Sequence, residues 1–316
     1  MKAALVTEAG KSPIYGDAPE PVAQAGEMRV TVTAAALSQL VRGRASGRHY
    51  SAKATLPFIV GVDGVGTLED GRRVYFALPD APNGAMAERT VVPATHCLPL
   101  PDGLDDVTAA AIAIPGMSSW AALVERAHLR PGETVLVNGA TGASGRLAVQ
   151  IAKHLGAGKV IATGRNAAVL ESLKALGADI VIPLTGDDAA VERRFQEQFA
   201  AGVDVVIDYL WGRSAELLLT AGAKAGPEGV PIRFVQVGSI SGGDITLPAA
   251  ALRSSAIVLM GSGLNSVPMD RILAAIDGVL KAAVPAGLQV ATRPVPLSEV
   301  TQAWDEPGDA RVVFIP

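Results

Sequence analysis

Three glycines separate a buried apolar run from an amphipathic one in the middle of the chain. They are Gly139, Gly142 and Gly145 in "VLVNGATGASGRLAVQIAKHLG", residues 135–156. The N-terminus of a helix binds anions, because its first N–H groups have no partner within the helix and lie at the positive end of the helix dipole. Side chains at this place would keep phosphates away. The spacing therefore predicts that the turn binds a pyrophosphate.

The glycines match the G-x-G-x-x-G fingerprint of dinucleotide-binding proteins with one change. Ala140, Gly142 and Gly145 stand at its three glycine positions, so alanine replaces the first glycine. Gly142 permits the close approach of a phosphate, and Gly145 permits close packing of the helix on the strand. The segment that follows has an apolar face at helical spacing and ends at Gly156. We predict dinucleotide binding; the alternative is a structural tight turn.

The next strand ends in "VIATGRN", and this position indicates which dinucleotide fits. NAD-binding proteins usually have Asp or Glu about 20 residues after the glycines, whereas an arginine there suits a 2′-phosphate. Arg165 lies at that distance from Gly145, and no carboxylate follows it before Glu171. A guanidinium can hold a phosphate through two parallel hydrogen bonds. NADP(H) is therefore predicted in preference to NAD(H), unless Arg165 is only a solvated surface residue.

The elements that must position these residues alternate regularly after residue 133. Six apolar runs are each separated by a helical segment or a comparable stretch, and their continuous apolarity indicates strands covered on both faces. This pattern is typical of an α/β protein with a doubly wound parallel sheet. The predicted strands are 134–138, 159–163, 180–182, 204–208, 232–238 and 256–261.

The first 115 or so residues have a different pattern. In "MRVTVTA", residues 28–34, apolar and polar side chains alternate, as in a half-buried strand, and other short apolar runs are punctuated by Gly and Pro. We expect a barrel-like β domain. A helix capped by Thr108 and a second helix through Trp120 to Ala127 then lead into the sheet. The last residues are expected to form a long helix and then strands that complete the first domain.

Composition restricts the class of protein. The 316 residues are 49% hydrophobic and 18% charged, with a net charge of −4 and no cluster of Lys or Arg. This predicts a soluble, cytoplasmic protein without nucleic-acid or membrane partners. Cys97 is the only cysteine, so neither an internal disulfide nor a cysteine-based zinc site can form. Although His96 precedes it, we expect Cys97 to serve only in packing.

Motifs along nearly the whole chain resemble the medium-chain dehydrogenase/reductase superfamily, specifically its zinc-free quinone oxidoreductase-like branch. They include "LPFIVGVDGVG", "GAMAERTVVPATHCLPLPDGL", "AAIAIPGMSSWAAL", the glycine-rich block, "GVDVVIDYLWG" and the closing "ARVVFIP". The resemblance implies a GroES-like β-barrel domain, residues 1–118 and 264–316, and a six-stranded Rossmann domain, residues 119–263. It also implies that substrate and nicotinamide lie in the cleft between them. Short-chain reductases have similar glycines, but no tyrosine here has a lysine four residues on.

The chain departs from the zinc-dependent members of that superfamily at the metal ligands. These enzymes have a cysteine near the position of Ser38 and Gly-His-Glu where this chain has Gly61, Val62 and Asp63. Serine and valine cannot replace those ligands, so no metal is expected. Without a Lewis acid, unactivated alcohols are poor substrates. The resemblance therefore implies hydride transfer from NADPH to a quinone or an α,β-unsaturated carbonyl, with protonation from water.

The site residues follow from the fingerprint and from the resemblance. Ser38 is the catalytic candidate, as a donor to an oxyanion, although a hydroxyl satisfied by the backbone is the alternative. Asp63 is expected to be a structural hydrogen-bond acceptor. Tyr50, Met117 and Trp211 are candidates for the substrate site, with a polar loop and a core tryptophan as the alternatives for Tyr50 and Trp211. The cofactor-binding candidates are Asn138, Ala140, Thr141, Gly142, Ala143, Ser144, Gly145, Gly164, Arg165, Asn166, Val237, Gly238, Ser239, Gly261, Ser262 and Gly263.

Two other functions remain open from the sequence. One is a metal-free alcohol or carbonyl dehydrogenase of the same fold. The other is an NADPH-binding protein without catalysis, as lens crystallins of this family illustrate. The run "AIVLMG" at the expected edge of the sheet could pair across a two-fold axis, as it does in relatives, which predicts a homodimer.

Overall fold

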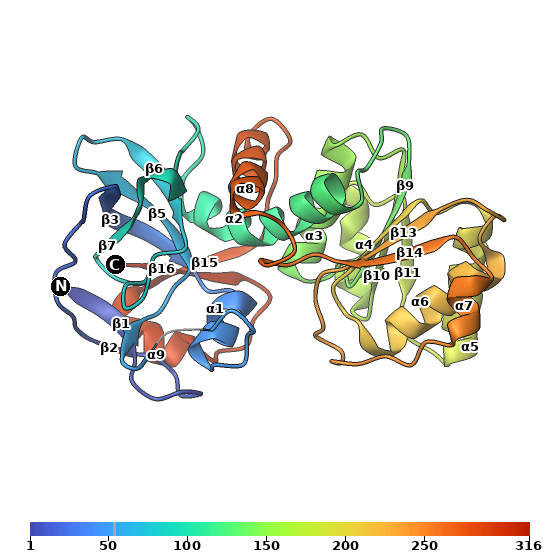
Figure 1. Ribbon diagram of the computed structural model, residues 1–316, viewed down its shortest axis with the longest axis horizontal. Helices are drawn as coiled ribbons and strands as arrows, with labels where there is room; N and C mark the ends of the chain where they lie inside the picture. The colour runs from blue at the N-terminus through green and yellow to red at the C-terminus, as the bar shows by residue number, and fades with distance from the viewer. Residues whose placement is uncertain (53–54) are drawn as a thin grey trace. The chain divides into compact units, whose positions relative to one another are not determined.

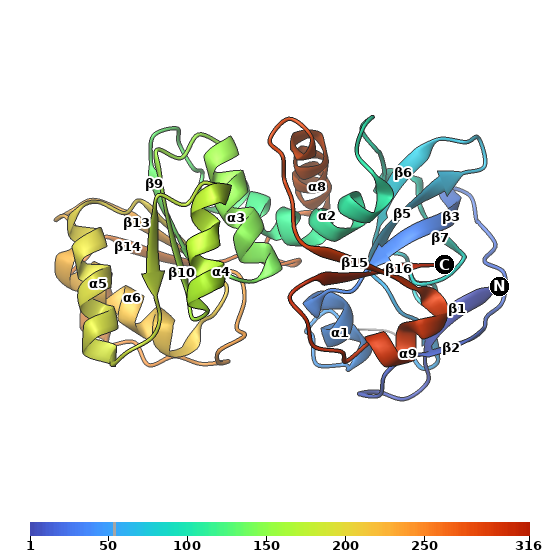
Figure 2. The same ribbon diagram turned by 180° about the vertical axis from the view of Figure 1, so that it is seen from behind.

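The computed structural model describes residues 1–52 and 55–316, and these form two compact units. The first unit combines Met1–Pro115 with Leu280–Pro316, and the second is the continuous segment Gly116–Val279. Figure 1 and Figure 2 show the two units from opposite sides. Each unit is described separately below.

The first unit is built mainly from two sheets. A three-stranded sheet has the order β2-β1-β4, and a seven-stranded sheet has the order β15-β16-β3-β5-β6-β8, with β7 also paired to β3. In β3, Val30 and Val32 are buried while Arg29 and Thr31 are exposed, which confirms the predicted alternation. The strands are β1 Lys2–Val6, β2 Ile14–Asp17, β3 Glu27–Ala36, β4 Phe58–Ile59, β5 Asp63–Leu68, β6 Arg73–Ala77, β7 Arg89–Pro93, β8 Cys97–Pro99, β15 Thr292–Pro296 and β16 Arg311–Ile315.

The end of the chain returns to the first unit. Strand β16 pairs antiparallel with β3, through Val313 opposite Ala36 and Phe314 opposite Ala35. Figure 1 shows this red strand beside the blue strands from the start of the chain. Val313 and Phe314 are fully buried, so the last strand contributes to the core. The helical segments of this unit are α1 Gln39–Ala45, η1 Ala94–His96, η4 Leu297–Glu299 and α9 Val300–Ala303.

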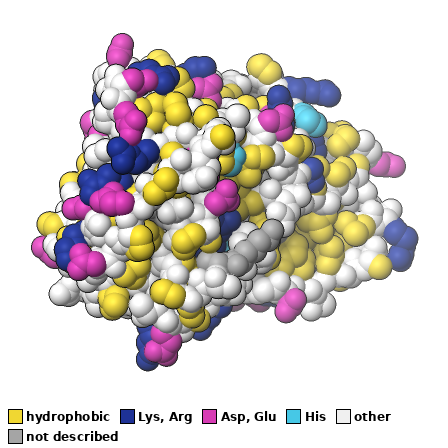
Figure 3. Space-filling view, turned by 60° about the vertical axis from the view of Figure 1, so that its left-hand side comes forward, with side chains coloured by type: hydrophobic (Ala, Val, Ile, Leu, Met, Phe, Trp, Pro, Cys, Tyr) yellow, Lys and Arg dark blue, Asp and Glu magenta, His cyan; other side chains and the backbone are white. Residues whose placement is uncertain are grey.

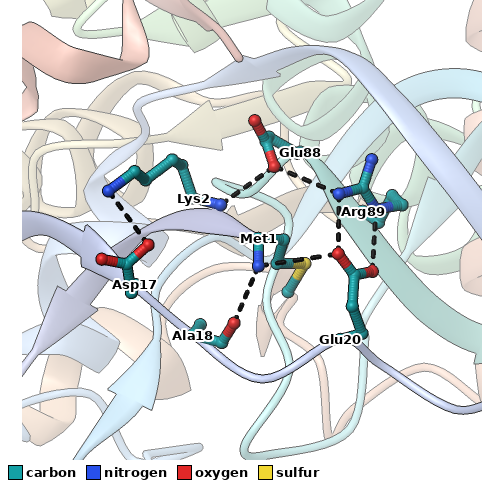
Figure 4. A network of polar contacts seen from close by, with 7 residues as sticks. All are labelled: Met1, Lys2, Asp17, Ala18, Glu20, Glu88 and Arg89. Carbon is teal, nitrogen blue, oxygen red and sulfur yellow. Dashed lines mark hydrogen bonds and ion pairs between the residues drawn. The ribbon is translucent and has the colours of Figure 1, made fainter.

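Polar contacts tie the first residues to Glu88, just before β7, and to the segment after β2 (Figure 4). The amino group of Met1 donates a hydrogen bond to the Ala18 carbonyl at 3.0 Å and lies 3.6 Å from the Glu20 carboxylate. Arg89 donates two hydrogen bonds to the same carboxylate, at 2.7 and 2.8 Å. The Lys2 amide donates to Glu88 at 2.9 Å. These contacts hold β1 in the three-stranded sheet.

The second unit contains a six-stranded parallel sheet in the order β11-β10-β9-β12-β13-β14. This order reverses between β9 and β12, which is the doubly wound arrangement predicted from the six apolar runs. All six predicted strands are present, with ends that differ by at most two residues. The strands are β9 Thr134–Asn138, β10 Lys159–Gly164, β11 Ile180–Pro183, β12 Val205–Asp208, β13 Ile232–Gln236 and β14 Ile257–Gly261.

Helices cover both faces of this sheet, since right-handed connections change face where the strand order reverses. Figure 2 shows α3 and α4 in front of the sheet. Helix α6 packs against both α5 and α7. Phe195, Phe199 and Phe234 are buried in the core between sheet and helices. The helical segments are α3 Ala143–His154, α4 Ala167–Ser172, η3 Leu173–Leu176, α5 Asp188–Ala200, α6 Gly212–Ala225 and α7 Ala249–Arg253.

Two helices cross the boundaries between the units. Helix α2 is Asp106–Ala121, continues as a π-helix η2 over Ala122–Arg126, and contains Pro115; α8 is Met269–Ala283. The two separate helices expected here are therefore one continuous helix. Its first turn is capped by Asp105 and not by Thr108 as expected: the Asp105 carboxylate accepts a hydrogen bond from the Thr108 amide at 2.9 Å. This helix is apolar and long enough to cross a membrane, but 72% of its most apolar window is buried in the protein.

The limits of the units differ from the expected ones at residues 118 and 264. The second unit begins at Gly116 and ends at Val279, so it includes most of α8. The reason is close packing of α8 on α2: a Cβ atom on Gly278 would lie 2.6 Å from Trp120, and one on Gly116 would lie 2.7 Å from Val279. Glycine at these two positions lets the helices approach each other.

Charges of both signs are interspersed on the face shown in Figure 3. Lys and Arg side chains there lie next to Asp and Glu side chains, with hydrophobic side chains between them. The chain has exposed salt bridges such as Arg29–Glu69, with 2.7 Å between Nη2 and Oε1. Exposed pairs of this kind contribute little to stability.

Candidate functional site: the carboxyl edge of the parallel sheet

The glycine-rich turn connects β9 to α3 at the carboxyl edge of the sheet. Gly139 has φ +86°, a conformation that favours glycine, and Gly142 is the N-cap of α3 in extended backbone. No side chain caps this helix end. Gly142 has no side chain that could occupy the first N–H groups, and the 12-residue helix places the positive end of its dipole here. This arrangement suits an anion.

The three glycines are required for different reasons. A Cβ atom on Gly145 would lie 2.5 Å from the Ala140 Cα and would also collide with the Gly139 carbonyl oxygen, so Gly145 lets helix and turn pack closely. A Cβ atom on Gly139 would lie 2.8 Å from Leu210. At Gly142 no described protein atom lies within 4 Å of such a Cβ, and φ is an ordinary −81°. Packing therefore does not require glycine at 142; glycine suits the N-cap position and leaves the space in front of the helix end open.

The other predicted residues of the turn have clear structural roles. Ala140 is fully buried, and its amide donates to the Thr163 carbonyl at 2.8 Å. The carbonyl of Thr141 accepts from Arg146 Nε at 3.1 Å, and Ala143 begins α3. The Ser144 carbonyl accepts from the Ser119 hydroxyl at 3.2 Å, which ties the first turn of α3 to α2.

Asn138 was predicted to bind the cofactor, but its side chain lies within the sheet. It is fully buried, and its amide nitrogen donates to Asp208 Oδ1 at 2.8 Å and to Ser214 Oγ at 3.0 Å. Both amide hydrogens are therefore used inside the protein. Burial raises the pKa of Asp208 to about 6, even though the Leu210 and Trp211 amides and Asn138 donate to this carboxylate. Asp208 and Thr163 were not singled out in the sequence, although each is a polar residue at the end of an apolar run.

Gly164, Arg165 and Asn166 follow β10 at the same edge. A Cβ atom on Gly164 would collide with the Thr141 methyl group, so glycine lets the two loops approach each other. Arg165 is exposed, and no described residue forms a hydrogen bond or ion pair with its guanidinium. The side chain of Asn166 caps α4 by accepting from the Val169 amide at 3.1 Å. Arg165 is therefore available for an external anion.

The two remaining cofactor segments follow β13 and β14. The predicted strand 232–238 ends at Gln236, so Val237, Gly238 and Ser239 lie in the loop after it. A Cβ atom on Gly238 would lie 2.8 Å from the Tyr209 carbonyl oxygen. Gly261 ends β14, and the loop continues with Ser262, whose amide donates to the Gln236 carbonyl at 2.8 Å, and with Gly263. Because the sheet is parallel, both segments leave it at the same edge as the glycine-rich turn.

The substrate candidates have different degrees of exposure. Met117 in α2 is buried, at 6% exposed, and Trp211 is half-buried with its ring 6.5 Å from that of Phe234, so it is partly a core residue. Trp211 also has φ +56°, which is unusual for a bulky residue. In the first unit, Tyr50 is 60% exposed and its ring lies 4.2 Å from that of His49.

The catalytic candidate, Ser38, is the N-cap of α1 and is 6% exposed. Its Oγ accepts from the Val41 amide at 3.1 Å, as the alternative interpretation expected, and the hydroxyl proton is not needed for this bond. Asp63 is a structural acceptor as predicted: it receives a hydrogen bond from the Tyr75 hydroxyl at 3.0 Å. Burial raises the pKa of Asp63 to about 7, while the positive charge of Arg311 partly offsets this.

No three His, Cys, Asp or Glu side chains within residues 1–52 and 55–316 converge to hold a metal ion. At the two positions where related enzymes have zinc ligands, the structure has the helix cap Ser38 and the buried apolar side chain of Val62. Cys97 is half-buried, burial raises its pKa, and the neighbouring His96 faces the Ala77 carbonyl oxygen at 3.1 Å from Nδ1.

Comparisons with known proteins agree with this geometry. Residues 143–278 match the family described as zinc-binding dehydrogenase. The chain is 31% identical to the "Probable NADPH-dependent quinone reductase tdiC" of Emericella nidulans over the whole of both chains. It is 29% identical to prostaglandin reductase-3 of Bos taurus over 84% of this chain and 71% of that protein. The quinone oxidoreductase of Thermus thermophilus, solved also with NADPH, superposes over both full chains with a TM-score of 0.83 and 28% identity. The protein therefore belongs to the zinc-independent quinone oxidoreductase branch of the medium-chain dehydrogenase/reductase superfamily.

Proposed function

We propose that the protein is an NADP(H)-dependent oxidoreductase that transfers hydride to a quinone or an α,β-unsaturated carbonyl without a metal ion. The observation that carries this proposal is Gly142, the bare N-cap of α3, where a Cβ atom would have no described protein atom within 4 Å. The names of the relatives support it, since they include an NADPH-dependent quinone reductase and a prostaglandin reductase. NADPH supplies the hydride when it is bound.

The chain's own residues would bind and orient the nucleotide. The amides of residues 142–145 would bind the pyrophosphate, and glycine at 142 would let its oxygens approach the helix end. Gly164, Arg165 and Asn166, at the end of β10, would hold the adenosine ribose. The exposed Arg165 guanidinium, which lacks a described acidic partner, pairs with the 2′-phosphate and favours NADP(H) over NAD(H).

The nicotinamide end is assigned to the loops after β13 and β14. Backbone groups of residues 237–239 and 261–263 would hold the ring, since doubly wound sheets bind ligands outside their carboxyl edge. Met117, Trp211 and Tyr50 remain candidates for contacts with the acceptor. The Ser38 hydroxyl accepts from the Val41 amide and can still donate its own proton to an oxyanion. Protonation of the product carbon is assigned to water.

Direct binding and turnover together test this function. Titration calorimetry should show NADPH binding more tightly than NADH, and NADPH oxidation should require a 1,4-quinone or a 2-alkenal. Turnover of simple alcohols alone would instead favour the metal-free alcohol dehydrogenase. Tight NADPH binding without oxidation by any acceptor would favour a non-catalytic nucleotide-binding protein, and no binding of either nucleotide would refute the proposal.

The proposal extends to a homodimer in the cytoplasm, with a small electrophile as substrate and no nucleic-acid or membrane partner. Its support is β14, a terminal strand of the parallel sheet on which Val258 is 46% and Leu259 is 38% exposed. Exposed apolar edge strands pair readily with another chain, and a second copy would complete the sheet symmetrically. Light scattering should give twice the 32.3 kDa monomer mass, and Val258→Lys should give a monomer. A monomeric wild type would exclude this interface.

A further inference from the structure

Three fully buried polar side chains lie side by side at the carboxyl edge of the parallel sheet. Asn138 ends β9, Thr163 is near the end of β10, and Asp208 ends β12, and all three are 0% exposed. Strand β9 lies between the other two, with Asn138 opposite Asp208. A buried polar group is costly unless it is hydrogen-bonded, so the partners of these side chains show what the group stabilises.

The three side chains form a continuous hydrogen-bonded network. The Thr163 hydroxyl donates to Asn138 Oδ1 at 2.7 Å, and the Asn138 amide donates to Asp208 Oδ1 at 2.8 Å. The same amide donates to Ser214 Oγ in α6 at 3.0 Å. This network fixes the orientation of the Asn138 side chain and connects three adjacent strands. We call Asn138, Thr163 and Asp208 the strand-end network.

One end of the strand-end network holds the glycine-rich turn. The Gly139 amide donates to Thr163 Oγ at 3.1 Å, and the Ala140 amide donates to the Thr163 carbonyl at 2.8 Å. Thr163 therefore binds the first two residues of the turn, one through its side chain and one through its backbone. Gly139 has a positive φ, so these bonds fix the point where the chain leaves the sheet toward the helix end.

The other end of the network holds the loop that carries Trp211. The Asp208 carboxylate accepts from the Leu210 amide at 3.0 Å and from the Trp211 amide at 3.1 Å. Trp211 has φ +56°, and a bulky residue keeps this conformation only where its surroundings enforce it. Burial raises the pKa of Asp208 to about 6, which indicates that the carboxylate is kept here at a cost to the fold.

We propose that Asn138, Thr163 and Asp208 are positioning residues that hold the glycine-rich turn in its nucleotide-binding geometry without contacting the nucleotide. The inference rests on the proposed function, because it concerns the same nucleotide site. Amides that are already fixed in place lose no conformational freedom when an anion binds, so the network raises affinity through preorganisation. The network affects the binding of the pyrophosphate, which NADPH and NADH share, so it should affect both nucleotides equally.

The test is Thr163→Val, with Thr163→Ser as the matched control. Valine keeps the branched shape that suits a strand but removes the hydroxyl that binds both Gly139 and Asn138, whereas serine keeps that hydroxyl. Calorimetry on the full chain should show that valine raises the Kd of NADPH and NADH by the same factor, about tenfold or more, because a displaced turn would lose about one charge-assisted hydrogen bond to the pyrophosphate. Serine should leave both Kd values within about twofold of wild type, below the scale of one such bond.

A second variant tests the opposite end of the network. Asp208→Asn keeps the shape but replaces one of the two acceptor oxygens by a donor nitrogen, so the amides of Asn138, Leu210 and Trp211 must share a single acceptor oxygen. It should also weaken both nucleotides equally, and thermal melting would show whether each variant is folded. Folded valine and asparagine variants with wild-type Kd values would overturn the inference, as would a loss confined to NADPH, which would place the effect at Arg165. Wild-type protein that binds neither nucleotide would instead refute the proposed function.

Discussion

Replacing Gly142 by alanine should weaken nucleotide binding but leave the stability of the fold almost unchanged. No described atom lies within 4 Å of a Cβ atom at this position, and φ −81° with ψ 170° suits alanine. Alanine restricts the unfolded chain, which is worth about 0.4–1 kcal/mol, but it is a poorer N-cap than glycine by a similar amount. The free energy of unfolding should therefore change by less than about 1 kcal/mol.

Nucleotide affinity should respond much more strongly. The added methyl group stands where phosphate oxygens must approach the amides of α3, and it should remove one such charge-assisted hydrogen bond, worth about 1.5–3 kcal/mol. The Kd for NADPH should then rise by about 10- to 150-fold. Calorimetry measures this change, and thermal melting measures stability on the same samples.

Two other glycines provide matched controls for this experiment. Gly145→Ala should destabilise the fold by about 1–3 kcal/mol, because its Cβ meets the backbone of Gly139 and Ala140. Gly308→Ala, at a position in the first unit with no described atom within 4 Å, should change neither stability nor binding. Gly142→Ala protein with the wild-type Kd would refute the assignment of the pyrophosphate to this helix end.

Three further predictions concern single side chains. Arg165→Ala should weaken NADPH by about 1–3 kcal/mol and leave NADH almost unchanged in calorimetry; equal losses would contradict a 2′-phosphate contact. Asp63 has a folded pKa of about 7 against its ordinary 3.8, so its contribution to stability is present below pH 3.8 and is lost as the pH rises through 7. In urea titrations the ionisation of Asp63 should lower the free energy of unfolding by up to about 4 kcal/mol across this range. Asp63→Asn should remove this share of the pH dependence and leave the smaller share of Asp208, whose pKa is also raised; an unchanged pH dependence would disprove the role of Asp63. Glu20→Gln, in the exposed contacts of Figure 4, should leave the free energy of unfolding almost unchanged in the same titrations, and a clear loss would show a stronger network than its exposure allows.

The parallel sheet could be predicted because its strands are apolar on both faces. Each run ends at or next to a Gly, Pro or polar residue, so the predicted ends of the six strands agree with the observed ends to within two residues. The long helix α2 could not be predicted in the same way. Pro115 normally ends a helix, but here packing of Gly116 against Val279 holds the chain helical on both sides of the proline.

The candidate site was predictable where it depends on local sequence. The glycine spacing identifies the turn, since Gly142 begins the helix and Gly145 packs on Ala140 within a few positions, although Gly139 also meets the distant Leu210. The strand-end network depends on residues far apart: Asn138 and Asp208 are 70 positions apart and meet only because β12 pairs with β9. Only the order of the strands in the sheet makes them neighbours, and no local pattern contains this information.

The pairing of β16 with β3 also determines the order in which the chain can fold during synthesis. Residues 116–279 are continuous, so this unit can close around its sheet soon after Val279 leaves the ribosome. The β-rich unit must wait for residues 311–315, because they form the neighbour of β3. Its first 115 residues therefore remain incomplete during most of translation, with an open strand edge that is exposed to chaperones and to other nascent chains.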